Sequence, residues 1–120
     1  MNRPSLVLAL LVGALPLLAI PANAQSWQSR VKDELQILGH RNWILVVDSA
    51  YPAQVGAGIE TIETNSDQLE VVRSVLAEIR DSIHVRPVIS MDAELPFVPE
   101  QKGVGVSNYR AQICETFAWI

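Results

Sequence analysis

Three apolar runs stand out after residue 24. Trp43–Val47 is continuous, uncharged and rich in β-branched residues, which is typical of a strand buried on both faces. Ile59–Thr64 and Val85–Met91 are also rich in residues that favour strands. The pattern predicts strands in all three places, separated by loops over Ser49–Gly58 and Asp92–Gly103, which contain proline and glycine.

Three stretches follow a helical period instead. Ser26 is a predicted N-cap for a first helix, and Gly39 stands where a glycine commonly ends one. Asn65, with Gln68 three residues later, predicts the start of a second helix. Ser107–Ile113 is predicted to begin a third. The first two helices have apolar stripes at Val31, Leu35 and Leu38, and at Leu69, Val72, Val75, Leu76 and Ile79.

This alternation of helices and buried-type strands predicts an α/β fold, a small layered sheet with flanking helices. In such sheets, ligands bind in the loops beyond the carboxyl ends of the strands. The residues that flank the most apolar strand are therefore the first candidates for a site.

The N-terminus has the three regions of a secretory signal peptide. Arg3 is basic, residues 6–20 are almost wholly apolar, and Ala22-Asn23-Ala24 fits a cleavage site. We therefore expect residues 1–24 to be a signal peptide and 25–120 to be one periplasmic or secreted domain. The alternative is an uncleaved membrane anchor, but the run is short for a membrane span.

Composition narrows the possible partners of the mature chain. Arg3 is the only charged residue before the cleavage site, so the net charge changes from −4 to −5. This acidic balance argues against nucleic acids or a membrane surface as partners. Cys114 is the only cysteine, so a domain of this size has no internal disulfide. We expect a homo-oligomer, which would bury more surface.

His40 and Asp48 flank the strand predicted at 43–47. The simpler interpretations are that His40 is a turn residue or complements a helix dipole, and that Asp48 caps a loop. No phosphate loop or metal motif is present, and we expect no cofactor and no metal.

The segment from Leu38 to Ala53 reads LGHRNWILVVDSAYPA. It resembles the signature of the D-ribose pyranase and L-fucose mutarotase family, in which a Gly-His pair leads into an apolar strand and an Asp follows eight residues after the His. The resemblance covers about residues 30 to 110 and is strongest in the first third.

The resemblance implies a monosaccharide mutarotase or pyranase, an isomerase that interconverts anomers or ring forms of a sugar. It implies that His40 and Asp48 are catalytic and that the ligand is a monosaccharide. Tyr51 and Arg86 are further candidates for substrate binding. The simpler interpretations are that Tyr51 is a loop aromatic packed on the core and that Arg86 is an exposed arginine of a strand. An extended chain would hold His40 and Asp48 roughly 20–25 Å apart. We therefore expect either a bend after Gly39 or a site shared between subunits, and we favour the shared site.

The chain departs from the family in three places. Ser49 stands where Ala is usual, Ala50 stands where a polar residue or Gly is common, and no Tyr-x-Asn segment occurs before Ile120. The sequence therefore predicts a mutarotase-like domain that is incomplete at the C-terminus. Two alternatives remain, a sugar-binding or assembly module without turnover, and a truncated, inactive product.

The signal peptide gives a first testable prediction. Protein produced in an exporting host should begin at or next to Gln25, because the cleavage pattern ends at Ala24. Intact-mass spectrometry of the soluble exported fraction measures this. Protein that keeps Met1 and stays in the membrane fraction would contradict it.

Overall fold

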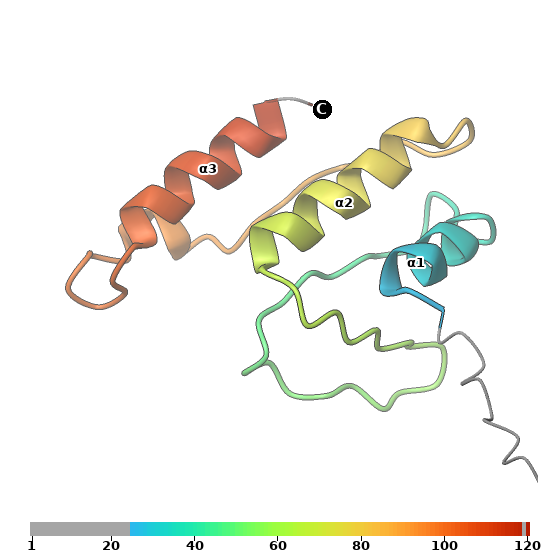
Figure 1. Cartoon of the computed structure of the whole chain (residues 1–120), viewed down its shortest axis with the longest axis horizontal. Helices are drawn as coiled ribbons and strands as arrows, with labels where there is room; N and C mark the ends of the chain where they lie inside the picture. The colour runs from blue at the N-terminus through green and yellow to red at the C-terminus, as the bar shows by residue number, and fades with distance from the viewer. Residues whose placement is uncertain (1–24, 119) are drawn as a thin grey trace, which may run out of the picture.

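The computed structural model describes residues 25–118 and residue 120. Their regular elements are helices: α1 (Trp27–Leu35), α2 (Gln68–Asp81), the short 3-10 helix η1 (Leu95–Phe97) and α3 (Val106–Ala118). α2 lies between α1 and α3 (Figure 1). The signal peptide predicted at 1–24 falls outside the described residues.

Helix α1 begins as the sequence predicts and ends earlier. The Ser26 hydroxyl oxygen accepts a hydrogen bond from the backbone N–H of Ser29 at 3.2 Å, which confirms the N-cap. The helix ends at Leu35, with Gln36 as its C-cap. Gly39 therefore does not end the helix. It opens a separate turn, in which the N–H of Asn42 donates to the Gly39 carbonyl at 3.0 Å.

The cap of α2 is Asp67 rather than the predicted Asn65. One Asp67 carboxylate oxygen accepts from the N–H groups of Leu69 at 2.9 Å and Glu70 at 3.4 Å. Asn65 adopts a left-handed conformation with φ of 50°, so it lies in the turn that precedes the helix. A carboxylate at this end also complements the helix dipole.

Helix α2 is buried on two faces, which the single predicted stripe did not anticipate. At 100° per residue, Val71, Val75 and Ile79 share the face that packs on α1. Leu69 and Leu76 are also buried, but on a face that Arg73 shares and that turns towards α3. Val72 falls between the two faces and is only partly buried, whereas Val71 is buried in its place.

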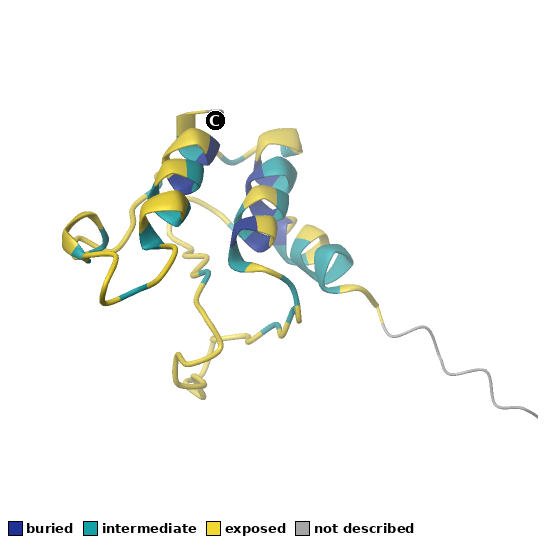
Figure 2. Ribbon diagram, turned by 60° about the vertical axis from the view of Figure 1, so that its left-hand side comes forward, coloured by how far each residue is buried: buried dark blue, intermediate teal, exposed yellow. Residues whose placement is uncertain are grey.

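The main apolar cluster joins α1 to α2. Its buried members are Leu35, Val71, Val75 and Ile79. Around them pack partly buried side chains from α1, from the turn after it and from two of the predicted strands: Trp27, Val31, Leu38, Val46 and Val85. In the described part of the chain the buried residues all lie on the helices, as the dark blue in Figure 2 shows.

Helix α3, which confirms the third predicted helix and extends it to Ala118, is joined to α2 by a polar contact. The Arg73 Nε–H donates to the Thr116 hydroxyl oxygen at 3.3 Å. Thr116 is buried, and its hydroxyl donates in turn to the Gln112 carbonyl at 2.7 Å. Ile113, also buried, lies one turn earlier on the same helix.

The predicted α/β fold is wrong for the described residues, because none of them forms a strand or a sheet. Residues 43–47, 59–64 and 85–91 run as irregular segments without ladder hydrogen bonds to one another. Apolar, β-branched residues favour an extended backbone, but a strand also requires a neighbour for its N–H and C=O groups. These three segments have residues that favour an extended backbone, but no neighbouring strand pairs with their N–H and C=O groups in the described structure.

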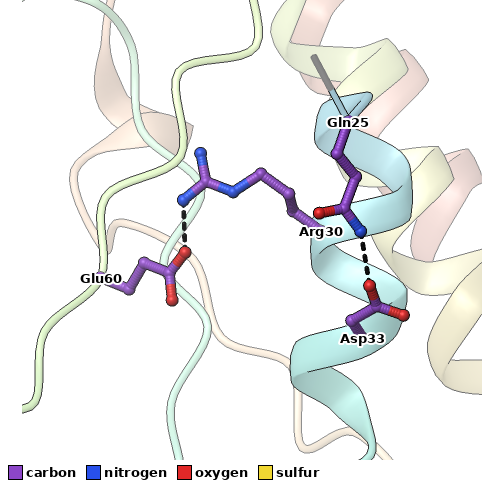
Figure 3. Close-up of polar contacts among 4 residues, drawn as sticks. All are labelled: Gln25, Arg30, Asp33 and Glu60. Carbon is purple, nitrogen blue, oxygen red and sulfur yellow. Dashed lines mark hydrogen bonds and ion pairs between the residues drawn. The ribbon is translucent and has the colours of Figure 1, made fainter. Parts of the chain in front are cut away.

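One of these segments is tied to α1 by an ion pair. Arg30 of α1 reaches across to the Glu60 carboxylate, while Gln25 and Asp33 form a separate contact along the helix (Figure 3). Both partners of the ion pair are 40% or more exposed, and exposed pairs of this kind contribute about 0–1 kcal/mol. The ion pair therefore fixes where residues 59–64 lie relative to α1 but adds little to the free energy of unfolding. Among the described helices, none has the length and apolar character needed to cross a bilayer.

The α1–α2 cluster leads to a second prediction. Ile79→Ala should reduce the free energy of unfolding by about 2–4 kcal/mol, because it removes a buried side chain and leaves a cavity. Ile83→Ala is the matched control, since Ile83 is 96% exposed, and it should change stability by less than about 0.5 kcal/mol. Urea unfolding followed by circular dichroism measures both. Equal effects of the two variants would contradict the assignment of the core.

Candidate functional site

His40 lies in the turn that follows α1. Asn42 closes this turn through its side chain as well, because the Gly39 N–H donates to the Asn42 Oδ1 atom at 2.7 Å. The turn leaves both His40 and Arg41 exposed. Neither side chain forms a hydrogen bond with another residue in the described part of the chain, so the His40 imidazole is open to a ligand.

Asp48 lies in a second turn, at the other end of the apolar segment. Its Oδ1 atom accepts from the Ala50 N–H at 2.8 Å, and its carbonyl accepts from the Tyr51 N–H at 3.2 Å. The sequence left open that Asp48 caps a loop, and it does so here. Its other carboxylate oxygen has no partner among residues 25–118. Tyr51, three residues on, is 47% exposed.

Arg86 makes local contacts. Its Nη1 group donates to the carbonyls of Ser82 at 2.9 Å and Val85 at 2.7 Å. Within the described ranges, no hydrogen bond or ion pair joins any two of the predicted site residues. Each of the four lies at an exposed position.

His84, which is not among the predicted site residues, makes two polar contacts. Its Nε2 atom lies 3.0 Å from the carbonyl of Leu35, and its Nδ1 atom lies 3.0 Å from the hydroxyl of Ser82. A carbonyl only accepts, so Nε2 carries the proton and, in the neutral ring, the Ser82 hydroxyl donates to Nδ1. His84 thereby links the C-terminal ends of α1 and α2. The only sequence signal for it is its place directly after α2.

Arg110 and Glu100 organise the loop between residues 85–91 and α3. Arg110 donates from Nη1 to the carbonyls of Val98 at 2.6 Å and Leu95 at 3.1 Å, which fastens η1 to α3. The Glu100 carboxylate accepts from the N–H of Gly105 at 2.5 Å and of Ser107 at 3.0 Å. It caps the N-terminus of α3 from outside the helix.

Two ionisable side chains respond to these surroundings. The Gly105 N–H, followed by the Ser107 N–H, lowers the pKa of Glu100 below its ordinary value of 4.5, and the Ser107 hydroxyl and Arg110 act in the same direction. Burial against the helices raises the pKa of Tyr109 above its ordinary value, and the negative charge of Asp67 raises it further. Both effects belong to the packing of α3.

Two hollows of the described surface are lined by residues other than the predicted ones. One is wide open and is lined by Ala93, Glu94, Phe97, Val98, Pro99 and Lys102. The other lies between α2 and α3 and is lined by Arg73, Ser74, Ala77, Glu115 and Thr116. No group of three or more potential metal ligands lies together in the described part of the chain.

Searches against protein-family models, curated proteins and solved structures found no match to this chain. The candidate site is therefore defined by the geometry of its own residues and by the sequence pattern around them.

The Glu100 cap provides a third prediction. Its lowered pKa means that the folded state favours the ionised carboxylate, so this stabilisation is complete above the ordinary pKa of 4.5. It is lost as the pH falls through the lower pKa of the folded state. Glu100→Gln should therefore unfold more easily than the parent at neutral pH, and the difference should shrink in strong acid.

Circular dichroism during urea unfolding, repeated across the acid range, measures this effect. Glu115→Gln makes the same change of a carboxylate to an amide, but on α3 itself and at a side chain for which no backbone hydrogen bond is seen, and it should not reproduce the loss. Identical pH profiles for the parent and Glu100→Gln would show that Glu100 does not cap α3.

Proposed function

We propose that this chain is a monosaccharide mutarotase or pyranase-like isomerase that acts outside the cytoplasm without a cofactor. The observation that carries the proposal is the pair of exposed turns at the two ends of one apolar segment. One turn presents the His40 imidazole and the other the Asp48 carboxylate. The resemblance of residues 38–53 to the pyranase and mutarotase signature supports the same reaction.

The reaction needs two proton transfers and no redox step. A base takes the proton of the anomeric hydroxyl, the bond between the anomeric carbon and the ring oxygen breaks, and the ring oxygen gains a proton. The open aldehyde then recloses on either face, or through another hydroxyl to give a different ring size. An imidazole both accepts and donates protons near neutral pH, and it therefore fits both steps. We assign these transfers to His40.

The other residues have binding roles in this proposal. Asp48 uses one carboxylate oxygen for its own turn, and the second is available to accept from a sugar hydroxyl. The half-exposed ring of Tyr51 offers an apolar face on which a sugar can stack. Arg86 uses only Nη1 in its local hydrogen bonds, and its remaining N–H groups can donate to sugar oxygens.

Exchange NMR between sugar anomers gives a direct test. The purified mature chain should exchange anomers of at least one common monosaccharide faster than the spontaneous rate. His40→Ala should lose most of the acceleration, because general acid–base catalysis typically contributes about 10²–10⁴-fold. Asp48→Asn should weaken sugar binding while its amide oxygen still caps the turn.

Asp92→Asn is the matched control for Asp48→Asn. Asp92 forms the same kind of turn, in which its Oδ1 atom accepts from the Glu94 N–H at 2.8 Å. This variant should keep the full exchange rate. An active parent whose rate is unchanged in His40→Ala would refute the catalytic role. A parent that binds sugar without exceeding the spontaneous rate would instead be a sugar-binding module.

A further inference from the structure

The apolar segment between the two turns is exposed. Trp43 is 87% exposed, Leu45 70%, and Val47 41%. Val46 alone packs against the α1–α2 cluster, which holds the segment on the body of the molecule. No backbone hydrogen bond involves residues 43–47 among those of the described chain. The segment is an edge with both an apolar surface and free N–H and C=O groups.

The other two extended segments have features that block pairing. Residues 85–91 contain Pro87, which has no N–H, and the charged Arg86. Residues 59–64 contain Glu60 and Glu63, and Glu60 is already held by Arg30. Charges and proline are the usual protection of exposed edges in monomeric proteins. Residues 43–47 have neither, so this segment alone is suited to strand addition.

The charges at its two ends identify the partner. Arg41 precedes the segment and Asp48 follows it. If two copies paired in parallel, Arg41 would face Arg41 and Asp48 would face Asp48. In an antiparallel pair, the basic end of each copy meets the acidic end of the other. The segment is therefore complementary to itself in one direction only.

We propose that two copies of this chain associate by antiparallel pairing of residues 43–47. Such a pair has a two-fold axis, and at this axis one residue lies opposite the same residue of the second copy. With Leu45 at that point, Trp43 faces Val47 of the second copy, and Ile44 faces its Val46. Every apolar side chain then meets an apolar one. A centre at Ile44 would instead place Arg41 opposite an apolar valine and Asn42 opposite another.

The pairing has a consequence for the proposed function, on which this step rests. An extended backbone over residues 42–48 would hold the turns of His40 and Asp48 roughly 20 Å apart within one chain. In the antiparallel pair, Asn42 faces Asp48 of the second copy, with Cα atoms about 4.5–5.5 Å apart. His40, in the turn that Asn42 closes, comes beside that carboxylate. The pair would hold two such sites, each with a histidine from one copy and an aspartate from the other.

Disulfide trapping tests the pairing without any sugar. The background is Cys114→Ser, because Cys114 is exposed and would cross-link by itself. Leu45→Cys should form a disulfide dimer under mild oxidation, since the two cysteines face each other across the axis. Val55→Cys is the matched control: Val55 is 95% exposed, lies outside the segment and should stay largely monomeric on a non-reducing gel.

The direction is read from two further variants. Trp43→Cys alone should not cross-link, whereas a mixture of Trp43→Cys with Val47→Cys should give the mixed dimer. Cross-linking of Trp43→Cys to itself would show parallel pairing and overturn the proposal. A monomer by light scattering at micromolar concentration, without cross-linking at Leu45, would overturn it as well.

Mixed oligomers separate this inference from the proposed function. His40→Ala loses most of the acceleration and Asp48→Asn binds sugar weakly. At limiting sugar, an equal mixture of the two should exchange anomers faster than either variant alone, by up to about a quarter of the parental rate, because half of the pairs carry one intact site. Cross-linking without recovery, in a parent that is active, would leave the dimer in place and refute the shared site. Cross-linking with an inactive parent would refute the proposed function but not the pairing.

Discussion

The packing of α1 against α2 is the contact on which the rest of the described chain depends. Leu35 meets Val71, Val75 and Ile79, and both Val46 and Val85 reach this cluster from the extended segments. A fully buried aliphatic side chain contributes about 1.5–3 kcal/mol, so a cluster this small leaves little reserve. Polar contacts between elements therefore matter more than in a larger domain. The hydrogen bond from His84 to Leu35 fastens the ends of the same two helices.

The helices could be predicted from the sequence because their signal is local. Apolar residues at helical spacing marked α1 and α2, and Ser26 was correctly predicted as the N-cap of α1. The third predicted helix, at Ser107–Ile113, falls within α3. The errors lie where two local signals compete or where a helix has two neighbours. Asn65 and Asp67 are both good caps, and the left-handed backbone of Asn65 decides between them. Val72 was predicted to be buried, but Val71 is buried instead. The reason is that α2 packs against helices on two sides, which a single apolar stripe does not describe.

The sheet could not be predicted from the same kind of signal, since pairing is not a property of one segment. Residues 43–47 have the composition of a buried strand, and yet all of them except Val46 are exposed. The candidate site shows a similar limit. The turns of His40 and Asp48 were located from sequence, but their partners were not. His84, Glu100 and Arg110 were missed because they bind backbone groups, and no residue spacing encodes such partners.

An uncharged edge of five apolar residues is a hazard for a monomer, because it can pair with any exposed strand. Here the edge is held on the α1–α2 cluster through Val46, while Trp43 and Leu45 face outward. The proposed antiparallel pair would remove this hazard and satisfy backbone groups that the chain leaves open. It would also join the two turns at the ends of the segment. A single association would thus bury the apolar surface and assemble the polar residues, which gives one physical reason for both the exposed segment and the position of His40 and Asp48 at its ends.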